Sequence, residues 1–358
     1  MSLYWTLFIL ILIIQFFPVR KNTERTAKVK LVLSLILLFI FGAIRVDFGR
    51  DYPAYENIFN EVKHYSFLSE YYDAHSEIGY LLLNKILPSY RFLIVLLTAF
   101  TCITYYYLFK NYIPRKYYWV GFLLMAIFGQ MMVFFQFSGL RNAITINIMA
   151  LSIPFIIKRK IFLFSLLVLL AYFFHTSAVF FMPLAYFIAT PTKFRKKELI
   201  SWSVIFLFLL LFSYSALIDF LASFIENYFG RYNSYIDTVN EATHKSTFIL
   251  FGFVFVMFIM TLIILYKENL PPADNVIMKL SMLFLLAFLL GALNFRMSQY
   301  FAPYFLISAT IVLNRVQHPL LKFGYISAVI VYMLYAFFVV YMGIPEFPYK
   351  EIHTIFDY

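Results

Sequence analysis

Apolar runs follow one another along almost the whole chain, and only short polar segments separate them. Most runs are too long for β-strands and approach the roughly 20 residues that a helix needs to cross a bilayer core. Hydrophobic residues make up 63% of the 358 residues and charged residues 13%, whereas a soluble domain is about half apolar and about a quarter charged. The mean hydropathy is +0.81. The chain is therefore predicted to be an all-α, polytopic integral membrane protein.

The polar breaks predict about twelve transmembrane helices, several of them short. Short spans indicate tilted, partial or interrupted helices around a cavity. The first run, from Tyr4 to Phe17, has no preceding basic region and no small-residue cleavage site, so we expect a retained helix rather than a signal peptide. The expected spans are 3–17, 31–44, 90–109, 117–135, 140–157, 161–174, 177–190, 199–217, 247–266, 277–292, 297–313 and 323–342.

The distribution of lysine and arginine among the loops predicts the orientation. One set of alternate loops holds most of the 29 basic residues and few of the 18 acidic ones, so this set is predicted to be cytoplasmic and both termini to lie outside. The whole chain, 1–358, is expected to form one membrane domain. Its longer outer loops are 45–89 and 218–246, where interfacial helices are expected. The loops predicted to be cytoplasmic are 18–30, 110–116, 158–160, 191–198, 267–279 and 314–322.

A charged turn from Arg45 to Tyr55 (RVDFGRDYPAY) directly follows the second expected helix. Arg45 and Arg50 can hold a phosphate, because a guanidinium group matches its oxygens in a two-pronged fork. Asp47 or Asp51 in the same turn can act as a base or hold an arginine in place. The alternative interpretation is a solvated loop with internal ion pairs.

Two further outer clusters each carry an arginine beside an apolar run. Arg141 follows Gln136 and Gly139 between the fourth and fifth spans, and Arg296 lies between the tenth and eleventh. An arginine in this position is costly unless it faces a cavity or has a partner. The adjacent helix N-terminus would also favour an anion near Arg141. The alternative for both arginines is a side chain that snorkels to the interface.

His175 stands at the apex between two short spans and is expected to lie partway into the membrane, in a cavity lined by protein. A histidine in this position is a candidate for proton transfer; the alternative is a satisfied core residue or a helix cap. Less specific candidates are Glu77 in the Ser76–Tyr80 segment and Arg231 in the second long loop.

Several functional classes find no support in the sequence. The single cysteine, Cys102, excludes a disulfide framework, and no metal-ligand spacing, P-loop, HExxH or GxSxG motif is present. No cofactor is expected. The basic residues belong to short loops between apolar runs, so nucleic acid is a poor candidate partner.

Arginines, one histidine and a few carboxylates on one membrane face suit an anionic, lipid-anchored substrate. A sugar linked through pyrophosphate to a polyprenyl lipid fits this description. Glycosyl transfer from it needs a base for the acceptor hydroxyl and stabilisation of the departing pyrophosphate, which arginines can provide without a metal.

Five segments resemble the EpsG family of polysaccharide-biosynthesis membrane proteins, within the broader Wzy-like repeat-unit polymerases. They occur in the expected order and span nearly the whole chain. The segments are Arg45–Tyr55, Glu77–Tyr80, Ser138–Asn142, His175–Ser177 and Asn294–Tyr300.

The resemblance implies a GT-C-like fold and the polymerisation of undecaprenyl-pyrophosphate-linked oligosaccharides at the outer face of a bacterial inner membrane, for an exopolysaccharide or O-antigen. Membrane lipid, a chain-length regulator and a flippase are the partners that it suggests. Asp51 or His175 would activate the acceptor hydroxyl. The expected substrate-binding residues are Arg45, Arg50, Arg141, Arg296, Tyr52, Tyr55, Glu77, Gln136, Arg231 and Tyr300.

Two alternatives share these features. A flippase for the same lipid-linked sugars would also need the helices and arginines, although duplicated halves are not visible in the sequence and the charges lie on one side. A membrane acyltransferase could use His175 as its base, but the short basic inner loops offer little for an acyl donor.

Overall fold

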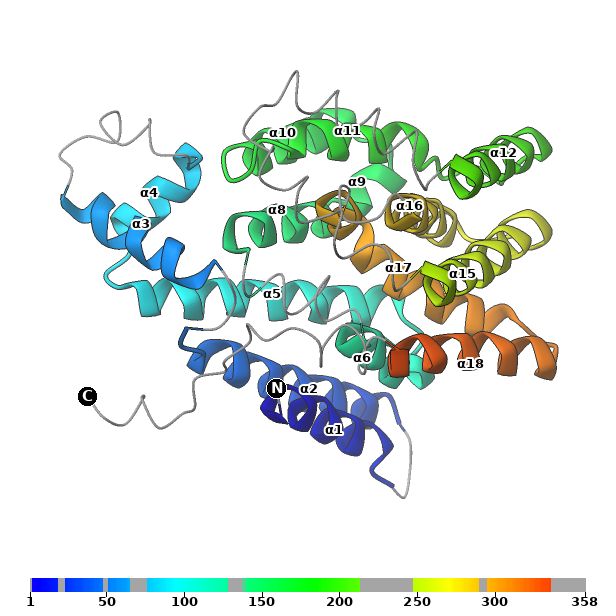
Figure 1. The fold of residues 1–358 in the computed structure, drawn as a ribbon, viewed down its shortest axis with the longest axis horizontal. Coiled ribbons are helices and arrows are strands. Elements are labelled where there is room, and N and C mark those ends of the chain that lie inside the picture. The colour runs from blue at the N-terminus through cyan, green and yellow to red at the C-terminus, as the bar shows by residue number, and fades with distance from the viewer. Residues whose placement is uncertain are drawn as a thin grey trace. The chain divides into compact units, whose positions relative to one another are not determined.

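In the part of the chain that the computed structural model describes, every regular element is a helix (Figure 1), which confirms the all-α prediction. Among the described residues, three helices are long and apolar enough to cross a membrane: α2 (Glu24–Ile44), α5 (Tyr90–Tyr112) and α16 (Pro272–Leu289). The fold is that of a helical membrane protein. Twelve spans, a GT-C-like arrangement and outer termini stay predictions. The described residues are 2–18, 23–47, 51–64, 76–127, 137, 139–212, 247–289 and 295–335.

The chain divides into two compact units at Phe187. Whether they act as the single expected domain stays a prediction. Besides α2 and α5, the helices of the first unit are α1 (Ser2–Phe16), α3 (Tyr52–His64), α4 (Ile78–Ile86), the 3₁₀ turn Arg115–Tyr117, α6 (Tyr118–Ile127), α8 (Leu140–Leu151), α9 (Ile153–Ile157), α10 (Ile161–Tyr172) and α11 (Ala178–Ile188).

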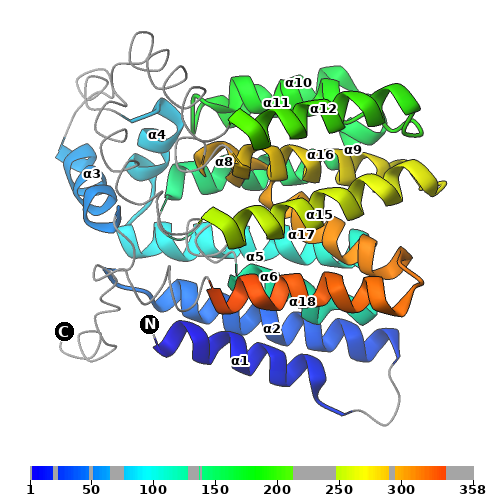
Figure 2. The ribbon, with the colours of Figure 1, turned by 45° about the vertical axis from the view of Figure 1, so that its right-hand side comes forward.

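The helices of the first unit pack in a row, α1 on α2, α2 on α5, α5 on α8 and α8 on α10 (Figures 1 and 2). Polar side chains join neighbouring helices within this row. Gln15 Nε2 donates to Ser34 Oγ at 2.9 Å, and Asn147 Nδ2 donates to Thr101 Oγ1 at 3.0 Å. Hydrogen bonds of this kind connect helices in lipid, where burial of apolar surface provides no driving force.

Helix α2 begins at Glu24, seven residues before the expected start at 31. The Thr23 side chain accepts from the Thr26 amide at 3.3 Å and caps the first turn. Lys30 fits into the helix because its Nζ donates to the carbonyls of Gln15 and Phe17, each at 2.8 Å. The basic residues that ended the apolar run therefore do not end the helix.

The expected span 140–157 is interrupted at Ser152, where α8 ends and α9 begins. Pro154 cannot donate a backbone hydrogen bond, and its ring prevents continuation of the preceding helix. The Ser152 hydroxyl donates to the Met149 carbonyl at 2.7 Å, which satisfies one carbonyl at the end of α8.

The long loop 45–89 contains α3 and α4, as expected for helical stretches in this loop. One face of α3 carries the buried side chains of Tyr52, Tyr55 and Phe59. Helix α3 packs against α4, and both contact α5. This arrangement fixes the start of α4, which carries the site described below.

The second unit contains α12 (Lys196–Phe212), α15 (Thr247–Lys267), α16, α17 (Phe295–Arg315) and α18 (Pro319–Tyr335). Helix α16 packs along α17, and α15 contacts α12, α16, α17 and α18. Lys279 of α16 is buried, and its Nζ donates to Thr190 Oγ1 at 2.7 Å and to Glu198 Oε1 at 3.2 Å. The segment that leads into α12 is thereby fixed to α16. The second long loop, 218–246, lies outside the described residues.

Candidate functional site

Glu77 occupies the N-cap position of α4, but its carboxylate does not cap its own helix. The backbone carbonyl of Glu77 accepts from the amides of Tyr80 and Leu81 at 3.0 and 3.1 Å, which starts the helix. The carboxylate is therefore available for contacts with other elements. It reaches the N-terminus of α8 and the turn between α10 and α11.

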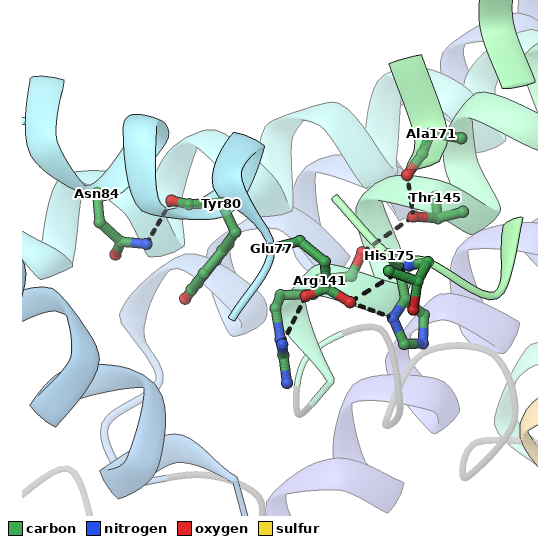
Figure 3. A network of polar contacts seen from close by, with 8 residues as sticks. Glu77, Tyr80, Asn84, Arg141, Thr145, Ala171 and His175 are labelled. Carbon is green, nitrogen blue, oxygen red and sulfur yellow. Dashed lines mark hydrogen bonds and ion pairs between the residues drawn. The ribbon is translucent and has the colours of Figure 1, made fainter. Parts of the chain in front are cut away.

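Three residues meet at this carboxylate, and Figure 3 shows Glu77 between Arg141 and His175. Arg141 Nη1 donates to Glu77 Oε2 at 2.6 Å, and His175 Nδ1 lies 2.9 Å from Glu77 Oε1. The Thr176 amide also donates to Oε1, at 3.3 Å. We call Glu77, Arg141 and His175 the carboxylate cluster. Its members come from the start of α4, the start of α8 and the turn between α10 and α11, which the charge distribution predicts to lie on the same side of the membrane.

The carboxylate cluster is partly shielded from solvent, since the side chains of Glu77 and His175 are 13% and 12% exposed. Burial by itself would raise the pKa of Glu77, but the hydrogen bond to His175 and the charge of Arg141 lower it to about 2. Glu77 is therefore ionised at neutral pH and can only accept hydrogen bonds. In the neutral imidazole, Nδ1 then carries the proton, and Nε2 is the nitrogen that can accept one.

The lowered pKa of Glu77 predicts how acid affects stability. The folded pKa of about 2 lies below the ordinary value of 4.5, so the unfolded chain binds the proton first and this contribution to stability falls as pH drops from about 4.5 towards 2. Above pH 4.5, wild type is expected to unfold at a higher temperature than Glu77→Gln, with a difference that shrinks in acid. Thermal unfolding of detergent-purified protein across this pH range measures it. Glu24→Gln is the control, because Glu24 is 74% exposed in a surface ion pair. A difference that does not vary with pH would contradict the prediction.

Aromatic side chains from α3 and α4 lie beside Arg141. Its guanidinium carbon is 5.8 Å from the centre of the Tyr55 ring, close enough for a cation–π contact. The Tyr55 and Tyr80 rings pack edge to face, with centroids 5.4 Å apart. Asn84 Nδ2 donates to the Tyr80 carbonyl at 2.7 Å, one turn further along α4. Tyr55, expected to bind substrate, therefore contacts the carboxylate cluster.

Backbone contacts hold the cluster's elements together. The Gly79 amide donates to the Phe173 carbonyl at 2.8 Å, which joins α4 to the turn that carries His175. The Thr145 hydroxyl of α8 lies 3.3 Å from the Arg141 carbonyl and 3.4 Å from the Ala171 carbonyl of α10. A Cβ atom at Gly79 would lie only 2.6 Å from the Phe173 carbonyl oxygen. Close approach of α4 to this turn therefore requires glycine at position 79.

Gly79→Ala is expected to destabilise the protein by about 1–3 kcal/mol, the usual cost of overpacking, and to move Glu77 away from His175. Thermal unfolding and the assay proposed below measure the two effects. Gly324→Ala is the matched control, because a Cβ atom there meets nothing within 4 Å. Wild-type stability and activity in Gly79→Ala would show that the close approach is not needed.

Arg45 lies inside the protein, with 1% of its surface exposed. Its Nη1 donates to the Gly42 carbonyl and, at 2.8 Å, to Thr98 Oγ1, and its guanidinium carbon is 4.6 Å from the centre of the Phe137 ring. These contacts join α2 to α5. A role for Arg45 in phosphate binding stays a prediction, and its position is that of a residue that fixes the C-terminal end of α2.

The remaining predicted residues lie elsewhere. Asp51 precedes α3, and its carbonyl accepts from the Tyr55 amide at 3.0 Å; among the described residues its carboxylate has no hydrogen bond or ion pair with the carboxylate cluster. The Tyr52 ring packs edge to face on Tyr90, 5.2 Å between centroids. Tyr300 is buried in α17 of the second unit. Outside the described residues are Arg50, Gln136, Arg231 and the side chain of Arg296.

Sequence reasoning placed Glu77 among the less specific candidates, whereas the structure places it at the centre of the cluster. Tyr80 and Thr176 lie in segments that the sequence singled out, although without a role of their own, whereas Thr145 was missed. The available signal was a carboxylate two residues before Gly79, at the start of a short amphipathic helix, which indicates a close contact but does not identify the partner. In the described part of the chain, no group of three or more His, Cys, Asp or Glu side chains is placed to hold a metal ion.

The model of the EpsG family matches residues 28–351, a range that includes the whole carboxylate cluster and nearly the whole chain. The chain belongs to the EpsG family. EpsG proteins are a Wzy-like family of polysaccharide biosynthesis, so this member is a membrane protein of polysaccharide biosynthesis. A search of curated proteins and a search of solved structures found no match.

Proposed function

We propose that this EpsG-family protein is a glycosyltransferase that polymerises undecaprenyl-pyrophosphate-linked oligosaccharide repeat units at the outer face of the bacterial cytoplasmic membrane. The observation that carries the proposal is the carboxylate cluster, in which a buried carboxylate holds an arginine and a histidine side by side. The arginine suits a phosphate group, and the histidine suits the proton of a hydroxyl group.

In the proposed reaction His175 is the base. Glu77 accepts from Nδ1, so Nε2 faces the acceptor with a lone pair, and the carboxylate stabilises the imidazolium that forms. The acceptor hydroxyl oxygen forms a bond to the anomeric carbon of the donor sugar as its proton passes to Nε2. The bond from the anomeric carbon to the pyrophosphate oxygen breaks, and the electron pair leaves with the lipid pyrophosphate.

Arg141 and the N-terminus of α8 suit the departing pyrophosphate. Arg141 is the second residue of α8, where the positive end of the helix dipole favours an anion. The Arg141 side chain is 24% exposed, so it lies at the edge of the buried cluster rather than deep in the core. A guanidinium group held in place by Glu77 stabilises the negative charge that develops without reorganisation.

An assay of the purified protein in liposomes with authentic lipid-linked repeat units, resolved by product length, tests the proposal. Chain growth at the expense of the lipid-linked unit is the expected result. Transfer of sugar-lipid across the bilayer with no chain growth would instead identify a flippase. Acyl modification of the sugars with no change in length would identify an acyltransferase.

A further inference from the structure

Helices α10 and α11 form an antiparallel pair, and the turn between them carries His175. An apolar groove of about 380 Å³ runs between the two helices. Its lining comes from one face of each helix and includes Ile161, Val168 and Tyr172 of α10, and Val179, Pro183 and Phe187 of α11.

The groove follows the pair from end to end. Ile161 is the first and Tyr172 the last residue of α10, and twelve residues of α-helix rise by about 18 Å. One end of the groove, at Tyr172 and Val179, meets the turn that carries His175. The other end meets the basic loop 158–160, which the charge distribution places on the cytoplasmic side. The groove therefore leads from the carboxylate cluster into the depth of the membrane.

The surroundings of the groove are those of a surface that faces lipid. Leu169 on α10 and Phe187 on α11 line it and are 52% and 66% exposed, and Phe162 beside it is 73% exposed. A lining that is mostly aliphatic and aromatic offers too few polar partners for ordered water. Pro183 has no backbone N–H, so it leaves the carbonyl of Val179 without its usual helical donor and favours a bend in α11.

Arg159 lies in the basic loop just before α10, at the end of the groove away from His175, and contacts the groove residue Tyr186. Its Nη1 donates to the Tyr186 carbonyl, and its guanidinium carbon lies 4.0 Å from the centre of the Tyr186 ring. Arg159 takes a left-handed backbone conformation, with φ of 52°, which is uncommon for a residue with a side chain. The basic loop is thus fixed to α11 at this end of the groove.

We infer that this groove binds the polyisoprenoid tail of the lipid-linked substrate, an inference that rests on the proposed function. A lipid whose pyrophosphate lies at Arg141 and His175 must lead its tail away along an adjoining apolar surface, and the groove begins at that turn. A groove of about 380 Å³ has room for a segment of one apolar chain, and an acyl chain of a phospholipid is the competing occupant that the test below distinguishes. The tail enters from the outer face and extends towards Arg159.

Photocrosslinking tests the inference without need of catalysis. The full-length protein carries a photoreactive phenylalanine at Val168 in the groove or, as the matched control, at Leu166, which is 48% exposed on the same helix and does not line the groove. Each is placed in vesicles that contain undecaprenyl pyrophosphate. Adducts are expected at position 168 well above position 166 and are expected to persist in excess phosphatidylglycerol. Equal labelling at both positions, or loss of the 168 adduct to phosphatidylglycerol, would overturn the inference.

A second measurement, of KM for substrates with long and short tails, distinguishes binding of the tail from an effect on the reaction itself. Val168→Trp fills the groove and is expected to raise the KM for the long-tailed substrate about tenfold, the effect of losing part of the buried apolar surface, with the KM for a short-tailed analogue unchanged. Leu166→Trp is the control, expected to match wild type. An equal loss with both substrates would mean that the groove is only structural.

The chain-growth assay and the photocrosslinking experiment test the proposed function and the groove separately. If wild type elongates no substrate but position 168 is labelled, the proposed function is wrong and the groove remains a binding site for the polyprenyl tail. If wild type elongates chains but position 168 is not labelled, the proposed function is supported and the groove does not bind the tail.

Discussion

His175→Ala is expected to slow chain growth by about 10²- to 10⁴-fold, the usual contribution of a general base. The imidazole is fixed through Nδ1 to Glu77 at 2.9 Å, so its removal takes away both the proton acceptor and the group whose charge Glu77 stabilises. The measurement is the initial rate of chain growth in liposomes with saturating lipid-linked substrate. Binding of that substrate is expected to change little, since Arg141, the proposed pyrophosphate-binding residue, remains.

The control for His175→Ala is His64→Ala. His64 is the last residue of α3, is exposed, and lies in the long loop 45–89 that also carries Glu77, and its loss should leave the rate unchanged. Thermal unfolding of both variants shows whether each is folded. A folded His175→Ala protein that elongates chains at the wild-type rate would rule out His175 as the base and return attention to Asp51.

Glu77→Gln distinguishes a positioning role from direct contact with substrate. Glutamine can still accept from Nδ1 but carries no charge, so the variant is expected to keep the imidazole in place and to lose part of the stabilisation of the imidazolium. Its rate should fall less than that of His175→Ala. Because Glu77 acts partly through His175, the double variant should lose less activity than the product of the two single losses. Fully additive losses would show that Glu77 acts independently of His175.

The helices could be predicted from the sequence because each apolar run has to satisfy its backbone hydrogen bonds internally. The boundaries could not, since they depend on contacts outside the run. Helix α2 starts before the predicted residue because Lys30 donates hydrogen bonds to carbonyls at the end of α1 and just after it. The predicted span that begins after Gly139 is interrupted at Ser152 because of Pro154. Charge placement indicated which loops share a face, but not which side chains would touch.

The two arginines at helix ends illustrate this limit. Arg45 and Arg141 look alike in sequence, each beside an apolar run with small polar neighbours. The structure buries Arg45 against Thr98 and Phe137, residues far along the chain, whereas Arg141 reaches Glu77, 64 positions away. Partners at such separations are set by how the helices pack, which a single sequence does not reveal. The site could therefore be predicted as a set of residue types on one face, but not as a carboxylate cluster.

Arg141→Ala is expected to lower the rate of chain growth by about 10²- to 10³-fold, as for loss of one donor that stabilises an oxyanion. Arg141→Lys should retain part of the activity, because a lysine supplies the charge without the planar fork. Arg115→Ala is the matched control, since Arg115 is 54% exposed and pairs with an exposed glutamate. Inorganic pyrophosphate should inhibit wild type and Arg115→Ala, but inhibit Arg141→Ala only weakly.

A double-mutant cycle separates pyrophosphate binding from the support of Glu77. If Arg141 acts only by holding the carboxylate, then Arg141→Ala in a Glu77→Gln background should change nothing further, because the ion pair at 2.6 Å is already lost. If Arg141 binds the leaving group, the second substitution should lower the rate again by a similar factor and weaken inhibition by pyrophosphate. A cycle in which the whole effect of Arg141 disappears with Glu77 would make Arg141 a structural partner of the cluster, and the pyrophosphate would then have to be bound by other residues.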